Sequence, residues 1–586
     1  MCGNETSPPP AIPLFLAGQN ASERTLFAWY HAPPAAVRRQ AGIVVCPPLG
    51  YEYMSSYRAL RILAERLAAL GFDTLRVDYD GTGNSEGCAD DPARVDAWLR
   101  TVERAMAEVR RRTESDTMAL VGLRAGSILA LRAGAAAGSV ARIVLWSPFQ
   151  SGRAYIRELT ATARLSAQDD VCDHDAETGI NAEGYLFTDE TVSDLKRWTL
   201  GDLTTSPAGE ILILDREDRP VGAALESTLA AAGAAVASIA TRETAAMLMP
   251  PHLSQLPIDA LHDIEEWFRT WHPSPAPAPV PGTTLPVSTA SPRSERAVRF
   301  GARERLFGIL ACCDEASDKP AVILLNTGAG HHVGPHRLYV PMARAWAERG
   351  HLVLRFDLGG LGDSGLPPGY DLESVAYPEH MLDDAREAIE FVRRQAPQRP
   401  IIVAGLCSGG WLAFQAARHG LGVEGVISIN APFYLYDADR QWLRDRRAIA
   451  RYQRAALDPA KWRKALRGRA SYAAFTRLAT ATLARQISVR LAAAARRAPV
   501  DAFARDLCDI AGRGTSCLFV FSSGDNGLAY FLRHAQSTLR RSNVRGLMRH
   551  VVVENAGHTF RPIAAQRALA GLLDEFVAAP ASAASG

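Results

Sequence analysis

The chain repeats one long pattern twice, and this duplication restricts its fold more than any other feature. Residues 42–85 and 322–364 share the same order of segments: an apolar strand, a Gly/Pro loop, an amphipathic helix, a second strand, and an Asp with a Gly-rich turn. The repeat has the length of a domain, unlike the short units of solenoid proteins. Short strands that alternate with helices of about 10–15 residues predict βαβ units. We therefore expect two tandem α/β domains, each a mostly parallel sheet with helices on both faces.

A proline-rich segment separates the two copies. Residues 272–292 read HPSPAPAPVPGTTLPVSTASP, and such a composition predicts an extended linker rather than a packed core. The predicted domains are residues 1–271 and 293–580. A chain of 586 residues agrees with this division, because it is longer than one hydrophobic core usually supports.

Composition excludes several classes of function. Lys and Arg (65) nearly balance Asp and Glu (63), so the net charge of +2 gives no support for nucleic acid as a partner. The sequence has no apolar run of about 18 residues that could span a bilayer, and its start lacks the basic and apolar parts of a signal peptide. The nine cysteines are scattered and lack metal-ligand spacing. We expect a cytoplasmic protein without a metal site.

The turn Gly-Leu-Cys-Ser-Gly at residues 405–409 is the strongest chemical signal. It lies between an apolar strand and a helix, the context of a nucleophile elbow with Cys407 at the centre. The glycines allow close packing around a strained central residue, and the helix N-terminus favours a thiolate. Taken alone, the motif could also be a glycine-rich connection with a buried thiol. Ser408 as the nucleophile would shift the glycine spacing by one residue.

Two residues further along complete a candidate catalytic triad. Asp525 follows the strand SCLFVF, and His558 lies in a loop after a later strand, so nucleophile, acid and His occur in the α/β-hydrolase order. Singly, each would be interpreted as a turn Asp or a structural His. Together they predict that His558 moves the proton of Cys407 while Asp525 orients the imidazole. The backbone N–H groups of Ser408 and Ala329 are the predicted oxyanion donors.

A second glycine motif, at residues 360–365, matches the dinucleotide pattern GxGxxG. A dinucleotide site needs this loop to open a helix. The Leu-Pro-Pro-Gly sequence at 366–369 stops such a helix. We therefore expect no nucleotide cofactor.

The first copy has an elbow without a nucleophile, because Arg124 occupies the centre of GLRAG at residues 122–126. A guanidinium cannot attack a carbonyl carbon, so we predict a pseudoenzyme domain, with Asp218 and His252 near the other triad positions. Two interpretations stay open. The domain is kept for folding and for contact with its neighbour, or Arg124 binds an anion such as phosphate or carboxylate at the helix N-terminus.

Each half also inserts residues where hydrolases carry a cap. The second insertion, 437–497, is basic and helical by composition, and we assign a helical cap to residues 437–510. The first insertion is acidic, with nine Asp and Glu residues between positions 169 and 194. Such runs indicate solvated helix faces, contact between the two caps, or a basic mouth for an anionic acyl donor such as coenzyme A or an acyl carrier protein.

At these motifs the chain resembles the α/β-hydrolase superfamily and, more narrowly, the pair of hydrolases associated with exosortase A systems. GLRAG and LWSPFQSGRAYIREL in the first half resemble hydrolase 2 of that pair, and HHVGPHRLYV, RFDLGGLGDSG and GLCSGG in the second half resemble hydrolase 1. The resemblance implies acyl chemistry without naming a substrate. GLCSGG is also similar to the Cys elbow of dienelactone hydrolases, and Cys at this position recurs in thioesterases that favour transfer or cyclisation.

The expected function is therefore acyl transfer. An ester or thioester would be cleaved through a thioester acyl-enzyme and released to water, an amine or an alcohol, in a biosynthetic pathway. The first domain would be a non-catalytic partner in intramolecular contact with the second. The alternative is a scaffold or anion-binding module in which both elbows are vestigial.

Overall fold

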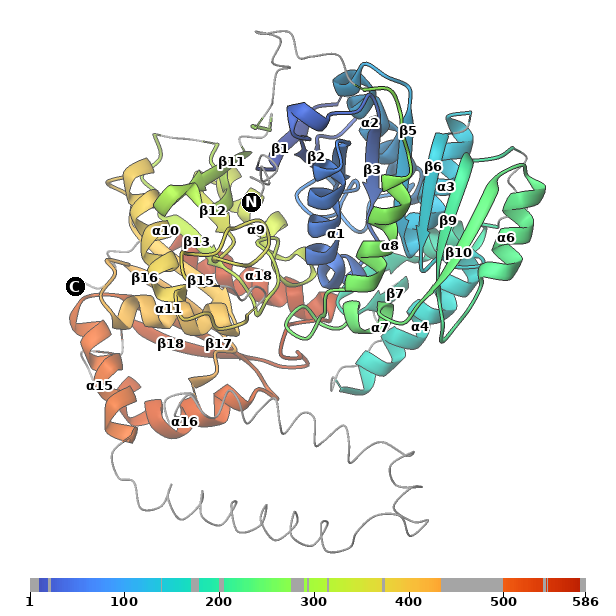
Figure 1. Ribbon diagram of the computed structural model, residues 1–586. Coiled ribbons are helices and arrows are strands. Elements are labelled where there is room, and N and C mark those ends of the chain that lie inside the picture. The colour runs from blue at the N-terminus through green and yellow to red at the C-terminus, as the bar shows by residue number, and fades with distance from the viewer. Residues whose placement is uncertain are drawn as a thin grey trace, which may run out of the picture.

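The computed structural model contains two eight-stranded sheets, one from each half of the chain (Figure 1). It describes residues 10–18, 20, 23–138, 140–169, 179–199, 205–275, 289–291, 295–313, 316–370, 375–433, 499–540, 544 and 546–579. The strands of one sheet all lie between residues 12 and 241, and those of the other between 295 and 553.

The first sheet has the strand order β1-β2-β4-β3-β5-β6-β9-β10. Its strands are β1 (Ile12–Leu16), β2 (Leu26–His31), β3 (Gly42–Cys46), β4 (Asp73–Val77), β5 (Met118–Leu123), β6 (Val140–Trp146), β9 (Ala208–Arg216) and β10 (Ala235–Thr241). β2 pairs antiparallel with both β1 and β4, whereas all later pairs are parallel. The parallel strands are almost continuously apolar, as expected for strands buried on both faces.

The second sheet repeats this arrangement in the order β11-β12-β14-β13-β15-β16-β17-β18. Its strands are β11 (Glu295–Phe300), β12 (Leu306–Ala311), β13 (Ala321–Leu325), β14 (Leu352–Phe356), β15 (Ile401–Leu406), β16 (Gly425–Ile429), β17 (Ser516–Ser522) and β18 (Met548–Val553). The antiparallel and parallel pairings follow the same pattern as in the first sheet. The two tandem α/β domains predicted from the repeat are confirmed, and their strand order agrees with the α/β-hydrolase fold expected from the turns.

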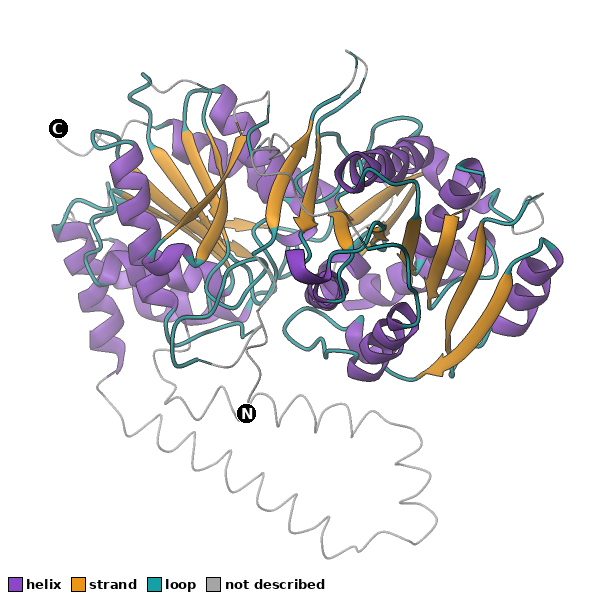
Figure 2. Cartoon of the chain, turned by 45° about the horizontal axis from the view of Figure 1, so that its top comes forward, coloured by secondary structure: helices purple, strands orange, loops and turns teal. Residues whose placement is uncertain are grey.

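Helices cover both faces of each sheet (Figure 2). In the first domain they are α1 (Tyr51–Ala69), α2 (Arg94–Thr113), α3 (Ala125–Ala136), α4 (Gly152–Asp169), α5 (Asp189–Lys196), α6 (Gly222–Ala231), α7 (Thr244–Met247) and α8 (Ile258–Arg269). In the second they are α9 (Tyr339–Glu348), α10 (Met381–Gln395), α11 (Ser408–Arg418), α15 (Pro499–Gly512), α16 (Asn526–Leu539) and α18 (Ile563–Ala578). Short 3-10 turns occur at Ala35–Val37, Ala302–Glu304 and Pro335–Arg337.

The insertion of the first domain contains a small hairpin between α4 and α5. Its strands are β7 (Gly179–Ala182) and β8 (Tyr185–Thr188), which pair only with each other. In the second domain, the predicted basic cap at 437–497 lies outside the described residues. The last part of the predicted cap, 499–510, belongs to helix α15, whose Phe503 and Leu507 are fully buried in the hydrophobic core of the second domain. Helix α15 packs on α11 and α16, so this part of the predicted cap lies against the body of the domain.

The two domains meet through corresponding loops of the repeat. Arg76 at the end of β4 donates to Asp363 of the second domain over 3.1 Å, and Arg355, its counterpart on β14, donates to Asn84 of the first over 2.9 Å. Trp29 on β2 also packs on Phe307, with ring centroids 4.6 Å apart. Reciprocal contacts of this kind give the boundary an approximate two-fold character, as in an isologous dimer interface.

Candidate active site

Cys407 occupies the single residue between strand β15 and helix α11. Its φ of +57° is in the left-handed region, where a residue with a side chain is strained. Its N–H donates to the carbonyl of Ile429 over 2.8 Å, which holds the turn against β16. A Cβ added to Gly409 would lie 2.6 Å from the carbonyl oxygen of Asn326. The glycine spacing identified in the sequence is thus required for this turn to pack.

Asp525 and His558 come together at the end of strands β17 and β18. The Asp525 side chain caps helix α16, accepting from the N–H of Gly527 over 2.7 Å. Its other oxygen lies 2.5 Å from Nδ1 of His558. The carboxylate is buried, whereas 48% of the His558 side chain is exposed. A fixed Asp that holds one ring nitrogen leaves Nε2 of His558 available to act on another group.

The thiol and the imidazole of this group shift each other's ionisation. Burial raises the pKa of Cys407, but the hydrogen bond and charge of His558 outweigh burial and hold this pKa below its usual value. Burial lowers the pKa of His558, but hydrogen bonds to Asp525 and Cys407 dominate and raise it to about 10. These opposed shifts favour a thiolate next to an imidazolium at neutral pH.

The loop after β13 borders the elbow and carries one predicted oxyanion donor. Gly328 N–H donates to the Ser408 hydroxyl over 2.8 Å, which ties the loop to the start of α11. In the described part of the chain, no acceptor takes the N–H of Ala329. The N–H of Ser408 points to the Cys407 sulfur and lowers its pKa. Ser408 N–H therefore lies beside the Cys407 sulfur, and the loop that carries Ala329 is tied to the same turn.

Two residues near Cys407 and His558 were missed by the sequence analysis. The hydroxyl of Tyr377 lies 3.9 Å from the Cys407 sulfur and lowers the pKa of the thiol. The side chain of Asn430 donates to the carbonyl of His558 over 2.7 Å. Tyr377 belongs to a loop without any motif, so no sequence signal marks it. Asn430 directly follows an apolar strand, a position where polar side chains often reach a site at the carboxyl ends of a parallel sheet.

The first domain reaches the loop that carries His558. In hairpin β7–β8, the Asn181 side chain donates to the carbonyl of Arg561 over 3.2 Å. The Gln566 side chain donates to the carbonyl of Gly184, at the tip of the hairpin, over 3.0 Å. An ion pair between Glu183 and Arg561 of 3.2 Å adds a third contact. The chain just after His558 is therefore held by the insertion of the other domain.

Arg124 occupies the centre of the elbow in the first domain. The turn is retained, with φ of +56° and an N–H that donates to the carbonyl of Trp146 over 2.9 Å. The guanidinium is buried, and two carboxylates bind it, Glu52 at 2.9 Å and Glu158 at 2.6 Å. It also lies over the ring of Phe149. Of the two interpretations left open for Arg124, these contacts favour a structural role, because carboxylates of the chain itself bind the guanidinium.

The other triad-like residues of the first domain do not join Arg124. Asp218 forms an ion pair with Arg216 at the surface, 2.7 Å long. His252 is exposed in the segment before α8. Within the described residues, neither side chain forms a hydrogen bond or ion pair with Arg124. The first elbow therefore has no proton-transfer pair beside it.

One group of side chains has the composition of a metal site. Ligand atoms of His332, Asp357 and Asp363 all lie within 4.8 Å of one another. These atoms already have partners: His332 bridges Asp357 and Asn84, and Asp363 accepts from Arg76. The cluster therefore helps to join the domains, and its potential metal-ligand atoms are already engaged in hydrogen bonds or ion pairs within the protein.

Two family models match the chain. Residues 322–572, which include Cys407, Asp525 and His558, match the model described as alpha/beta hydrolase family. Residues 40–169, which include Arg124, match the model described as serine aminopeptidase, S33. The chain thus contains two α/β-hydrolase domains in tandem and is an enzyme of the hydrolase type. The comparison with curated proteins finds no match. Among the described helices, none is long and apolar enough to cross a bilayer.

Several solved structures match parts of the chain at low sequence identity. XC6422 from Xanthomonas campestris, an α/β serine hydrolase without a lid, is 18% identical, with 46% of this chain and 97% of that chain covered and a TM-score of 0.31. Est1E from Butyrivibrio proteoclasticus is 15% identical, with coverages of 44% and 98% and a TM-score of 0.32. The esterase Pf2001 from Pyrococcus furiosus is 14% identical, with coverages of 48% and 91% and a TM-score of 0.31.

Proposed function

We propose that the second domain is an acyl-transfer enzyme that uses Cys407 as its nucleophile, His558 as its acid and base, and Asp525 to orient the histidine. The observation that carries this proposal is the strained Cys407 whose thiol pKa is lowered by His558, itself held 2.5 Å from Asp525. The substrate is an ester or thioester, and no bound cofactor is required for this chemistry.

The first half of the reaction forms an acyl-enzyme. The thiolate of Cys407 attacks the carbonyl carbon and forms a C–S bond, while the carbonyl π electrons move to oxygen. The N–H groups of Ser408 and Ala329 stabilise the resulting oxyanion. When the oxyanion collapses, the bond to the leaving oxygen or sulfur breaks, and the His558 imidazolium gives that atom its proton.

The second half releases the acyl group. Neutral His558 takes a proton from water, an amine or an alcohol, whose oxygen or nitrogen then attacks the thioester carbon. Collapse of this second intermediate expels the Cys407 thiolate beside the newly protonated His558. A thioester intermediate reacts with amines more readily than an oxygen ester does. Transfer or cyclisation is therefore as accessible to this site as hydrolysis.

The first domain acts as a non-catalytic partner in this proposal, because Arg124 is held by Glu52 and Glu158 and cannot attack a carbonyl. The motifs around the two elbows favour a role like that of the paired hydrolases of exosortase A systems, in a biosynthetic pathway. The described cysteines are all free. A reactive thiol suits a reducing compartment, and we propose the cytoplasm.

The test combines thiol labelling with an activity assay on the full chain. We expect iodoacetamide at pH 6 to label Cys407 before the other cysteines, as read by peptide mass spectrometry. Cys407→Ala should reduce cleavage of a short-chain thioester by at least about 10³-fold. Cys88→Ala, which removes an exposed thiol of the first domain, is the matched control and should keep full activity. Uniform labelling together with unchanged activity of Cys407→Ala would support a non-catalytic scaffold instead.

A further inference from the structure

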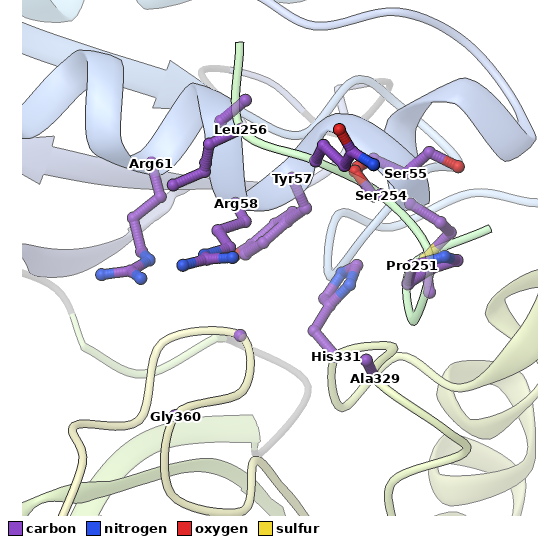
Figure 3. Close-up of a pocket in the computed structure, with 14 residues that line it drawn as sticks. Ser55, Tyr57, Arg58, Arg61, Pro251, Ser254, Leu256, Ala329, His331 and Gly360 are labelled. Atoms are coloured by element: carbon purple, nitrogen blue, oxygen red, sulfur yellow. The ribbon is translucent and has the colours of Figure 1, made fainter. Parts of the chain in front are cut away.

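A pocket lies between the domains, where helix α1 of the first faces two loops of the second (Figure 3). Its upper wall is formed by α1 and by residues 251–256, which precede α8. Its lower wall contains Ala329 and His331 from the loop after β13, and Gly360 from the loop after β14. Neither domain alone encloses this space.

His331 is a buried side chain in this pocket with unmet hydrogen-bonding groups. It is 2% exposed, and its ring stacks on Tyr57 of α1 with centroids 4.0 Å apart and planes at 15°. Neither ring nitrogen has a hydrogen-bond partner among the described residues. Buried polar groups of folded proteins are nearly always paired, so an unpaired donor and acceptor in a pocket indicate a polar ligand.

The pocket is also positively charged. Arg58 and Arg61 lie one turn apart on α1, and Figure 3 shows both side chains extending from the helix toward the loop of Gly360. Arg61 is ion-paired with Glu65, 3.0 Å away on the same helix. None of the residues that line the pocket is Asp or Glu. Two guanidinium groups at such a site suit a phosphate or carboxylate.

The pocket shares the oxyanion loop with the proposed active site. Ala329 lines the pocket, and the neighbouring Gly328 donates to Ser408, the residue after the nucleophile. A substrate whose carbonyl sits at Cys407 can therefore continue across this short loop toward α1. We propose that Arg58, Arg61 and His331 form a subsite that binds an anionic group, phosphate or carboxylate, in the part of the substrate remote from the reacting carbonyl.

This subsite rests on the proposed function and sharpens its substrate class. The substrate is an ester or thioester that carries an anion away from the scissile bond, and the cations that recognise this anion come from the domain without a nucleophile. The pseudoenzyme domain then contributes to substrate binding. This contribution explains why the two domains are packed against each other on the side of the oxyanion loop.

The experiment compares two thioesters that share an acyl group, one on coenzyme A, which carries phosphates, and one on neutral N-acetylcysteamine. In the full chain, Arg58→Ala/Arg61→Ala should raise KM for the coenzyme A thioester at least about tenfold, with kcat and the neutral thioester changed less than about twofold. Arg66→Ala, on the same helix but outside the pocket, is the matched control. His331→Phe keeps the ring stacked on Tyr57 and should raise KM selectively as well.

Each outcome decides between the two proposals. Equal effects of the Arg58/Arg61 change on both thioesters would overturn the subsite and leave the acyl-transfer function intact. If the unaltered chain cleaves neither thioester and Cys407 is not labelled preferentially, the proposed function fails. Calorimetric titration with coenzyme A then tests the subsite alone: binding that is lost in Arg58→Ala/Arg61→Ala but kept in Arg66→Ala supports it, and the absence of binding to the unaltered chain overturns it.

Discussion

At the scale of single residues, the two domains differ most at the centre of the elbow. Cys407 and Arg124 have nearly the same backbone conformation, with φ of +57° and +56°. The strained turn is therefore present even where its central residue cannot act as a nucleophile. In the second domain the turn presents a thiol to His558. In the first, it holds a guanidinium inward between Glu52 and Glu158. In the proposed function, the side chain at this position, and not the fold, therefore decides which domain can carry out acyl transfer.

The ionisation of Cys407 gives a prediction about pH. Because its pKa is lowered, the thiolate is present above that lowered pKa, and its reactivity is lost only as pH falls through it. His558, whose pKa is raised to about 10, stays protonated until pH rises through this value. We expect activity to follow a bell with a broad plateau around neutral pH. In His558→Ala, the main opposition to burial is lost and only the smaller effects of Tyr377 and the Ser408 N–H on the thiol pKa remain. Iodoacetamide labelling of Cys407 should then require a higher pH than in the unaltered chain, measured as labelling rate against pH.

The Arg124 ion pairs give a prediction about stability. Burial raises the pKa of Glu52, and Arg124 opposes this rise. Removing one partner of a buried pair leaves an uncompensated charge and destabilises by about 3–5 kcal/mol. Arg124→Ala should therefore lower the first unfolding transition in scanning calorimetry, and the loss should shrink as pH falls and Glu52 becomes protonated. Arg124→Ala/Glu52→Gln should recover part of it. Unchanged unfolding in Arg124→Ala would contradict this role.

The sequence predicted the residues of the site whose positions depend on the chain near them. Cys407 is marked by adjacent glycines, and Asp525 and His558 by the strands that they follow. Tyr377 approaches the sulfur from a loop with no motif, and its contact depends on how that loop crosses the sheet edge. The fate of Arg124 was equally hidden, because Glu52 and Glu158 are distant in sequence and look like ordinary helix residues.

At the scale of elements, the hairpin β7–β8 is the clearest case of a segment whose role depends on the other domain. Asn181 and Gly184 bind the chain at Arg561 and Gln566, directly after His558. His336 of the second domain reaches the same stretch, at the carbonyl of Thr559 over 3.0 Å. The loop that carries His558 is thus held by contacts from both domains, although it lies at the protein surface.

Loss of the contacts between this hairpin and the chain after His558 should affect catalysis without affecting substrate binding. Asn181→Ala removes the donor to Arg561, and Gln566→Ala removes the bond to Gly184. Together they should lower kcat about tenfold with KM nearly unchanged, because a histidine displaced from its position loses efficiency in proton transfer. Labelling of Cys407 at pH 6 should slow in parallel. Asp189→Asn, at the exposed start of α5, is the control and should leave both rates unchanged. A rise in KM alone would contradict a positioning role.

The elements themselves were largely predictable, and helix α15 shows what the sequence did not reveal. The spacing of apolar residues predicted the parallel sheets, because each apolar strand of the repeat is buried on both faces. Helix α15 follows a long basic run in the sequence. Its Phe503 and Leu507 are spaced for one helix face, and their burial in the core of the second domain distinguishes this helix from a solvated one.

At the scale of the whole molecule, the duplication predicted two domains but not the surface through which they meet. That surface is formed by loops that are also held by hydrogen bonds within their own domain. Tyr53 donates to Asp78 in the first domain as His332 pairs with Asp357 in the second, and these braced loops then face each other. Arg337 adds hydrogen bonds to the carbonyls of Gly83 and Gly87, both 2.8 Å long. No motif in either half marks these loops as a contact surface between domains.

The contacts between the domains predict that the linker is not needed to hold them together. The apolar cluster around Trp29 and Phe307 and the hydrogen bonds of Arg337 lie within folded parts of the domains. A protease site inserted between residues 276 and 288, once cleaved, should leave two fragments that co-elute in gel filtration at the mass of the full chain and retain thioester cleavage. Trp29→Ala/Arg337→Ala should release the fragments from each other, because it removes both an apolar and a polar anchor. Separation of the unaltered fragments would show that the linker maintains the pair. Loss of activity on that separation, restored by mixing at high concentration, would still assign the first domain a part in the reaction.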